Sequence, residues 1–278
     1  MRPGVWLQHL LPHELMARVV YGAARSRRDW IRRPLIRWFA KQYRVDLDEA
    51  AERDLERYPT FNAFFTRQLR AGARPIAGDE ATVVSPVDGL LTEHGEARDG
   101  QLIQAKGFDY AIEELLGEGP VPAADFARAS YATIYLAPHD YHRVHMPVAA
   151  SLLATRYVPG RRFSVNAATT CGIRNLFCRN ERVVCWFDTG SAPMALVLVG
   201  ALNVSSISTR TQGEILSGAP RYWPESPPVA LAKGDEIGAF NLGSTVIVLF
   251  PEGSVRWHET LAAGARLRLG GAIGTRVA

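Results

Sequence analysis

A glycine–serine pair stands near the carboxyl end of the chain, directly before a run of apolar residues. Gly243 and Ser244 precede Val246–Phe250, whose composition predicts a buried strand. A serine hydroxyl that follows glycine can attack the preceding carbonyl carbon, because glycine has no side chain to block the approach and tolerates strained backbone angles. The amide would become an ester, and elimination of that ester would break the chain. A plain turn is the alternative interpretation of such a pair.

This attack needs a base, and the base needs a group that orients it. Three histidines, His139, His142 and His145, lie within the proline-bracketed segment Pro138–Pro147. Asp88 supplies a carboxylate in a Ser-Pro-Val-Asp-Gly turn. Each histidine alone is more often a structural or exposed residue, and it is their density beside arginine and tyrosine that favours a chemical role. A His-x-x-His pair could also bind a metal, but no clear thiol or carboxylate completes such a site in the sequence.

The elements that must position these residues fall into two regions. Residues 1–70 read as helical, and from about residue 81 short β-rich runs alternate with glycine and proline. The predicted helices are Leu7–Val20, Asp29–Tyr43, Asp46–Arg57 and one that begins near Thr60, with a short one at Ile112–Leu116. The predicted strands are Ala132–Leu136, Arg182–Phe187, Ala195–Val199, Val204–Thr209 and Val246–Phe250. The sequence therefore predicts an α+β fold with a mainly β catalytic core, residues 71–278, preceded by a helical region, residues 1–70.

The helical region combines basic and aromatic residues. Nine lysine or arginine residues and one acid, Asp29, stand from Arg18 to Arg44, interleaved with Trp30, Trp38 and Phe39. Aromatic rings and cations together suit the boundary between lipid headgroups and acyl chains. This favours a peripheral membrane contact. A solvated basic face packed on the protein through its aromatic residues is the main alternative, and nucleic acid binding is a weaker one.

Composition sets the outer limits. The chain has 278 residues, of which 47% are hydrophobic and 22% charged, as in a folded globular protein. Its net charge of +4 is too small to indicate nucleic acid as a partner. The longest apolar run, Met194–Ala201, is far shorter than the roughly 18–20 residues of a spanning helix, and the beginning of the chain lacks the pattern of a signal peptide. The cysteines Cys171, Cys178 and Cys185 are odd in number, which does not suggest a complete disulfide framework, and they are expected to be reduced thiols, buried or half-buried.

Several of these segments together resemble one family, the prokaryotic-type phosphatidylserine decarboxylases, which are pyruvoyl-dependent and self-processing. The resemblance rests on motifs that occur in the family's order between about residues 60 and 255. They are Ser85–Gly89, Asp140–Pro147, Phe163–Asn166, Arg179–Arg182, Lys233–Gly238 and Leu242–Thr245.

The resemblance implies roles for the residues singled out above. Asp88, His145 and Ser244 would form the self-cleavage triad, and Gly243–Ser244 would be the cleaved bond. Ser244 would become a covalent pyruvoyl group, which forms a Schiff base with phosphatidylserine and accepts the electrons released with carbon dioxide. His142, which flanks His145, is the candidate proton donor. The product would be phosphatidylethanolamine, and no external cofactor or metal is implied.

The same resemblance predicts partners and a location. The large chain, residues 1–243, and the small chain, residues 244–278, would stay together as a heterodimer on the cytoplasmic side of the cell membrane, bound peripherally. Whether copies form a homo-oligomer is left open, and no nucleic acid is expected. Two other functions compete: a non-catalytic peripheral lipid-binding module that ignores Ser244, and a serine hydrolase that uses Ser244, His145 and Asp88. The chain lacks the Gly-x-Ser-x-Gly elbow that many serine hydrolases carry, which counts against the second of these functions.

Overall fold

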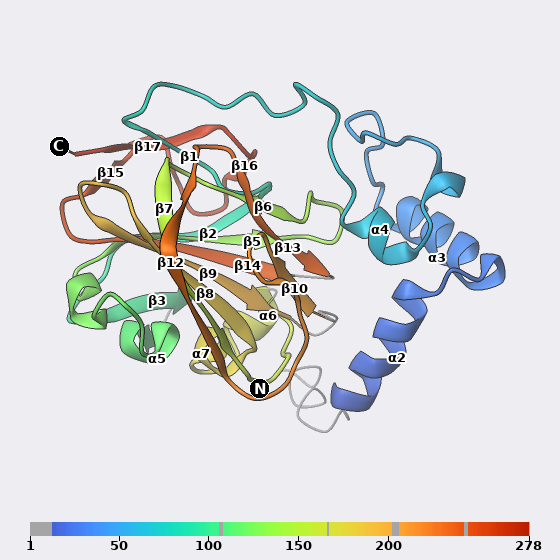
Figure 1. Cartoon of the computed structure of the whole chain (residues 1–278), viewed down its shortest axis with the longest axis horizontal. Helices are drawn as coiled ribbons and strands as arrows, with labels where there is room; N and C mark the ends of the chain where they lie inside the picture. Colours follow the sequence, from blue (N-terminus) through green and yellow to red (C-terminus); the bar gives the residue numbers. More distant parts are fainter. Residues whose placement is uncertain (1–12, 106–107, 166, 202–205, 242–243, 278) are drawn as a thin grey trace.

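Helices open the chain and strands build the rest, as the predicted α+β class requires (Figure 1). The structure is a computed structural model, and it describes residues 13–105, 108–165, 167–201, 206–241 and 244–277. Its helices are α2 (His13–Arg25), α3 (Asp29–Gln42), α4 (Phe61–Phe65), α5 (Ile112–Leu116), α6 (Ala167–Thr170) and α7 (Leu176–Arg179), with 3-10 turns η1 (Leu55–Arg57) and η2 (Ala123–Phe126). Its strands are β1 (Thr82–Val84), β2 (Gly89–Glu96), β3 (Gln101–Ala105), β4 (Phe108–Ala111), β5 (Ser130–Leu136), β6 (Arg143–His145), β7 (Ala150–Val158), β8 (Arg182–Asp188), β9 (Pro193–Gly200), β10 (Ser206–Thr209), β11 (Gly213–Ile215), β12 (Arg221–Leu231), β13 (Glu236–Asn241), β14 (Ser244–Phe250), β15 (Val255–Trp257), β16 (Arg266–Leu267) and β17 (Ala272–Arg276).

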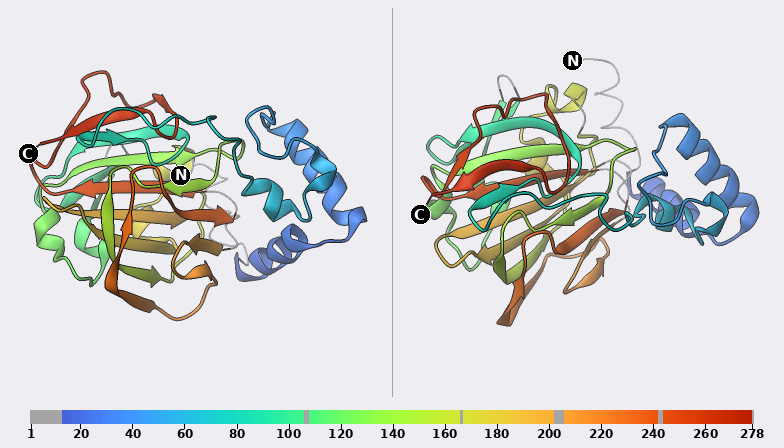
Figure 2. Two further views of the ribbon diagram at one scale, coloured as in Figure 1. Left: turned by 45° about the horizontal axis from the view of Figure 1, so that its top comes forward. Right: turned by 90° about the horizontal axis from the view of Figure 1, so that it is seen from above.

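The helices α2, α3 and α4 lie together at one end of the molecule, beside the β body (Figure 2). They share a small aromatic cluster of their own, formed by Phe39 of α3 with Tyr58, Phe61, Phe64 and Phe65. Helix α4 begins where the sequence predicts, because the Thr60 hydroxyl accepts a hydrogen bond of 3.0 Å from the backbone N–H of Ala63. The part of the predicted first helix before residue 13 lies outside the described residues.

The predicted helix Asp46–Arg57 is wrong. Apart from the short turn η1, this segment has no helix. Its acidic side chains bond their own backbone instead: Asp46 accepts from the N–H of Asp48, and Asp54 accepts from the N–H of Glu56. Such local bonds offer the backbone an alternative to a helical ladder. The acids that were read as a helix start therefore form turns.

The core is an antiparallel sheet of eight strands in the order β12-β7-β8-β9-β14-β5-β2-β16. β14 lies in the middle of this order, between β9 and β5, and all seven of its residues are buried. A strand buried on both faces explains the unbroken apolar run in the sequence. The predicted strands at β5, β8, β9 and β14 are confirmed, and β14 begins two residues earlier than predicted, at Ser244. The strand predicted over 204–209 is described from Ser206 onward as β10.

A second sheet, in the order β11-β10-β13-β6, carries part of the histidine segment. β6 pairs with β13, which places His145 opposite Glu236. β1, β17 and β15 form a third sheet, and β3 pairs with β4. The short helix α5 has the predicted bounds.

Two further expectations concern the cysteines and the membrane. Cys178 and Cys185 are buried free thiols, and burial raises the pKa of each to about 12. Cys171 is free but exposed, which differs from the expected burial. Within the described residues no helix combines the length and the apolar character needed to cross a bilayer.

Candidate active site

Ser244 is the first residue of β14, and its backbone pairs with Leu136 of β5 and Gly200 of β9. The side chain is fully buried, and its Oγ has no hydrogen-bond partner among the residues that the structure describes. Such a hydroxyl has lost its bonds to water and gained none, which is uncommon for a purely structural serine. Gly243, the other half of the predicted cleavage site, lies outside the described residues.

His145, the last residue of β6, is held by two hydrogen bonds. Its Nδ1 lies 2.8 Å from the carbonyl oxygen of Gly234, and its Nε2 lies 3.1 Å from the hydroxyl of Tyr141. A carbonyl oxygen can only accept, so Nδ1 carries the proton and Nε2 accepts from Tyr141. Burial lowers the pKa of His145, opposed by the Gly234 bond and by the charges of Glu236 and Asp88. His145 is therefore a neutral base with its lone pair at Nε2.

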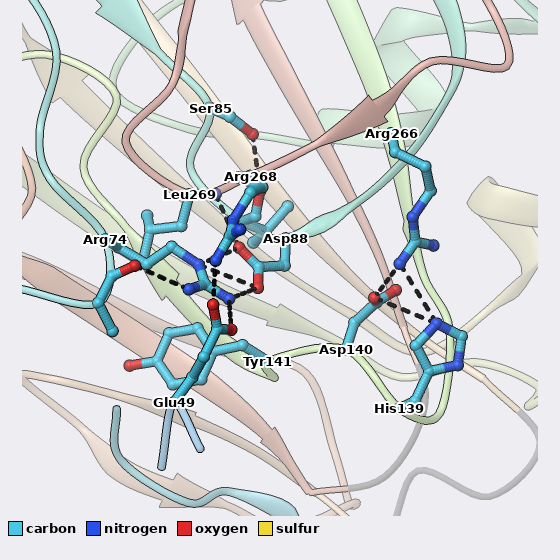
Figure 3. Close-up of polar contacts among 12 residues, drawn as sticks. Glu49, Arg74, Ser85, Asp88, His139, Asp140, Tyr141, Arg266, Arg268 and Leu269 are labelled. Carbon is cyan, nitrogen blue, oxygen red and sulfur yellow. Dashed lines mark hydrogen bonds and ion pairs between the residues drawn. The ribbon is translucent and has the colours of Figure 1, made fainter. Parts of the chain in front are cut away.

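Asp88 follows β1 in a buried turn, where its carboxylate is engaged by other groups (Figure 3). The Arg74 guanidinium donates to both oxygens, with Nε 2.9 Å from Oδ1 and Nη2 2.5 Å from Oδ2. The backbone N–H of Leu269 also donates to Oδ1, at 2.8 Å. In the described part of the chain Asp88 shares no hydrogen bond with His145, so its charge acts on that histidine through space. The Gly234 carbonyl occupies the orienting position that the sequence assigned to Asp88.

His142 is fully buried beside the helical region. Its Nδ1 donates to the carbonyl of Asp140 at 2.8 Å, and its Nε2 has no partner within the described residues. Its ring lies 4.1 Å from the ring of Phe65, centroid to centroid. Burial lowers the pKa of His142 to about 3. The imidazole is therefore neutral, and its bare Nε2 is a second unsatisfied polar atom, like the Ser244 hydroxyl.

His139 lies apart from this pair, on the open side of the same loop. Its side chain is half-exposed, with Nε2 3.2 Å from Nη2 of Arg266 and 3.5 Å from a carboxylate oxygen of Asp140. Asp140 is fixed by Arg266 at 2.5 Å and by the backbone N–H of Ala137 at 2.7 Å. The structure thus separates the three histidines that the sequence placed in one cluster.

The helical region reaches the site directly, which sequence reasoning missed. Besides the Phe65 ring, Arg67 donates to the carbonyl of His139 at 3.0 Å, and Arg143 donates to the carbonyl of Thr66 at 2.9 Å. Asn62 of α4 donates to the side chain of Asn241 at 2.9 Å. The only signal in the sequence was the density of aromatic residues after Pro59, which predicted a helix but no partner for it.

Tyr141, Gly234 and Arg74 bond the candidate residues His145 and Asp88, and the sequence did not single them out for this. Tyr141 and Gly234 do lie inside two of the quoted motifs, but Gly234 stands 89 positions from His145 in the chain, so the bond between them depends on the fold. Arg74 gave no signal. The described residues contain no group of three side chains suited to hold a metal ion.

An α+β protein with a buried serine that has no partner among the described residues, and with two neutral histidines, holds the groups that a reaction with a covalent step requires. Comparison with known proteins agrees. A family model described as phosphatidylserine decarboxylase matches residues 61–275, and a second, described as PSD, matches residues 3–44. The chain belongs to the phosphatidylserine decarboxylase family.

Its relatives align over nearly the whole length. A protein from Ectopseudomonas mendocina is 49% identical over 273 residues, covering 96% of each chain. One from Alcanivorax borkumensis is 46% identical over 276 residues, covering 97% of this chain and 94% of the relative, and one from Pseudomonas fluorescens is 48% identical over 273 residues, covering 96% and 95%. All three are named phosphatidylserine decarboxylase proenzyme.

Proposed function

We propose that this chain is a precursor that cuts itself between Gly243 and Ser244 and then decarboxylates phosphatidylserine at a membrane surface. Family membership makes the chain a carboxy-lyase that converts phosphatidylserine to phosphatidylethanolamine. The observation that carries the self-cleavage is the buried, unpartnered Oγ of Ser244 at the head of a core strand. The name proenzyme, which the relatives carry, agrees with a precursor.

The cleavage uses groups of the chain alone. Nε2 of His145 takes the hydroxyl proton of Ser244, and Oγ attacks the carbonyl carbon of Gly243. The new C–O bond replaces the C–N bond, and the freed nitrogen takes up a proton. Removal of the α-proton of residue 244 then expels the Gly243 carboxylate, and water releases ammonia from the new amino terminus. His145 suits the first step because burial keeps it neutral.

Asp88 keeps its place in the proposed triad with an electrostatic role. The Gly234 carbonyl and the Tyr141 hydroxyl already orient the His145 ring. When His145 takes a proton it becomes positive in a largely buried site, and the nearby negative charge of Asp88 stabilises that form. Arg74 fixes the position of this carboxylate, and it also partly neutralises its charge.

Ser244 fits the pyruvoyl group that the family implies. Among the described residues its hydroxyl has no other partner, and its residue begins a strand that would stay paired on both sides after the cut. Once formed, the group supplies a carbonyl that serves as the electron sink for decarboxylation. His142 is the proposed proton donor to the substrate carbon. Because its Nε2 carries no proton in the structure, His142 must first accept one there before it can donate.

The location and the partners follow from the helical region and from β14. We place the enzyme peripherally on the cytoplasmic side of the cell membrane, with residues 1–70 as the membrane-facing region and residues 71–278 as the catalytic domain. Trp30 and Trp38 of α3 support this, since they are 72% and 56% exposed. The large and small chains should remain a heterodimer, because β14 is central in the eight-stranded sheet.

Intact mass measurement tests the central proposal. Wild-type protein should give two chains, residues 1–243 and residues 244–278, with the second blocked at its amino terminus. The two should elute together under native conditions and separate only on denaturation. Ser244→Ala should stay whole. A wild-type chain that remains wholly uncut would support the lipid-binding module, whereas an uncut chain that hydrolyses esters would support the serine hydrolase.

A further inference from the structure

A polar cavity of about 310 Å³ lies next to the candidate site, between the helical region and the β body. Its walls come from four parts of the chain: the turn at residues 44–49, residues 67–74, the loop at residues 139–141 and residues 266–268. Asp88 also lines it. Figure 3 shows two groups of ion pairs in its walls, one around Asp88 and one around Asp140.

Five arginines line the cavity, and three of them are paired with carboxylates. Arg74 binds Asp88 and Glu49, Arg268 also binds Glu49, and Arg266 binds Asp140. The other two, Arg44 and Arg67, form no ion pair with an acidic residue in the part of the chain that the structure describes. Within the described residues the cavity therefore presents two arginines without an ion-pair partner, beside the carboxylate of Asp46, which also lines the cavity and forms no ion pair there.

Arg67 is the unusual one, because it is only 5% exposed. Its Nη2 donates to the His139 carbonyl, but Nε and Nη1 are enclosed and have no hydrogen-bond partner among the described residues. A buried guanidinium with idle donors is costly, since it has given up water without replacing it. Nε and Nη1 lie on different edges of the guanidinium, and each edge, together with a second N–H of Nη2, can offer a pair of hydrogen bonds to a negatively charged group with several oxygens.

We propose that this cavity binds an oxyanion of the phosphate class, held by Arg67 at its base and by the exposed Arg44 at its mouth. An oxyanion carries several acceptor oxygens, so it can take a pair of parallel bonds from one edge of the Arg67 guanidinium and further bonds from Arg44, whereas a single-atom ion such as chloride cannot match the paired geometry. The phosphate can come from two sources, a phospholipid headgroup or the free ion. The proposal rests on the cavity and does not depend on self-cleavage.

Binding would act on both halves of the site. Arg67 holds the carbonyl of His139, the neighbour of Asp140, whose own carbonyl fixes His142. On the other side the cavity borders the Asp88 carboxylate. An anion seated on Arg67 would therefore stabilise the loop that carries His142 without contacting Ser244.

The experiment measures ligand affinity by titration calorimetry on the full-length chain, both wild-type and the uncut Ser244→Ala variant. The ligands are inorganic phosphate and glycerophosphoserine, with sodium chloride at equal ionic strength as the blank. We expect both forms of the chain to bind at least one of these phosphates in a one-to-one ratio. Tighter binding of glycerophosphoserine identifies the headgroup as the source, and equal or tighter binding of phosphate identifies the free ion.

Variants locate the site. Arg67→Lys keeps the charge but loses the fork, and Arg44→Gln removes an exposed cation without touching the core; each should weaken binding roughly tenfold or more. Arg128→Gln, on a side chain 66% exposed and paired with Glu252 outside the cavity, is the matched control and should bind normally. If Arg67→Lys does not fold, Arg44→Gln decides. No binding beyond the chloride blank, or unchanged affinity in Arg44→Gln and in any folded Arg67→Lys, would overturn the proposal and leave ordered water as the partner of Arg67.

Discussion

At the scale of single residues, a backbone hydrogen bond and burial together keep His145 in the neutral form that a base requires. The Gly234 carbonyl fixes the proton on Nδ1, and the Tyr141 hydroxyl donates to Nε2. Burial raises the pKa of Tyr141, so that hydroxyl remains a donor throughout the physiological range. Before His145 can deprotonate Ser244, the Tyr141 hydroxyl must give up Nε2 or turn aside.

This arrangement predicts how self-cleavage depends on pH. The reaction needs neutral His145, whose pKa lies below the ordinary value of 6.5 because the ring is buried. The rate should therefore be flat at neutral pH and fall only at an apparent pKa below 6.5. The measurement follows the uncut fraction over time in newly synthesised chain at a series of pH values. His142→Ala should show the same acid limb, because His142 titrates near pH 3. A limb at or above 6.5 would contradict the assignment of His145.

A variant of Asp88 tests its charge separately from the orientation of the His145 ring, because other groups orient that ring. We expect Asp88→Asn to slow self-cleavage roughly tenfold, which corresponds to about 1.4 kcal/mol of lost stabilisation of protonated His145. His145→Ala should slow it more, by roughly 10²–10⁴-fold, since the base itself is gone. Cut fraction is read by denaturing electrophoresis.

Asp88→Asn also breaks a nearly buried ion pair with Arg74, so the melting temperature must be recorded beside the rate. Glu49→Gln is the matched control, because it removes the other carboxylate of Arg74 and leaves Asp88 in place. That variant should cut at close to the wild-type rate. Equal slowing in both variants would mean that the effect of Asp88→Asn is structural.

At the scale of elements, α3 divides its basic and aromatic residues between two tasks. Phe39 is buried in the aromatic cluster, so it is not a membrane anchor as the sequence suggested. Arg32 is buried too, where it donates to the carbonyls of Glu56 and Tyr58. Arg33 and Arg37 pair with Glu56. The residues left for a lipid surface include the exposed Trp30 and Trp38, four positions either side of Pro34, and the exposed Arg27, Arg28 and Lys41.

We expect the double variant Trp30→Ala, Trp38→Ala to bind anionic vesicles at least about tenfold more weakly, because each ring would otherwise bury apolar area in the interface. Arg27→Gln with Arg28→Gln should weaken binding mainly at low salt, since charge attraction is screened and apolar insertion is not. Co-sedimentation with vesicles at two salt concentrations measures both effects. The control is Tyr222→Ala, an exposed aromatic residue on β12. Unchanged binding in the tryptophan variant would favour the packed basic face instead.

At the scale of the whole molecule, the helical region is part of the site as well as a candidate anchor. Phe39 packs against Phe61, Phe64 and Phe65, and Phe65 contacts the ring of His142. Gly234 and Tyr141, which fix His145, both lie in the β body. We therefore expect the two proposed stages, self-cleavage and decarboxylation, to depend on the helices to different degrees.

Deletion of residues 1–45 should separate these stages. Self-cleavage should continue, because the bonds of His145 remain. Turnover should fall on vesicles and also on substrate dispersed in detergent, because loss of Phe39 exposes the aromatic cluster that supports His142; removal of one such ring costs about 3–5 kcal/mol. The assay compares cut fraction with carbon dioxide release in both substrate forms. Full turnover in detergent would show that the helices serve only as an anchor.

The sequence alone determined the fold class and the central strands, and it predicted the position of the candidate reactive serine. These features depend on local pattern. An apolar run such as Val246–Phe250 can only be a buried strand or helix segment, and a glycine followed by a serine is recognised directly in the sequence. It failed at Asp46–Arg57, where acidic side chains bond their own backbone. It also missed β12, whose prolines argue against a strand but are tolerated at a sheet edge.

Tertiary structure decided which partner each polar atom takes. His139, His142 and His145 are close in sequence, yet the fold gives them different surroundings. His139 is half-exposed, His142 is fully buried, and His145 is bonded to the backbone carbonyl of Gly234. The partners of Asp88 come from positions 74 and 269, and that of His145 from position 234. A hydrogen bond forms only between atoms about 3 Å apart, and those distances are fixed by the packing of sheets and helices from remote parts of the chain. Local pattern carries no information about them.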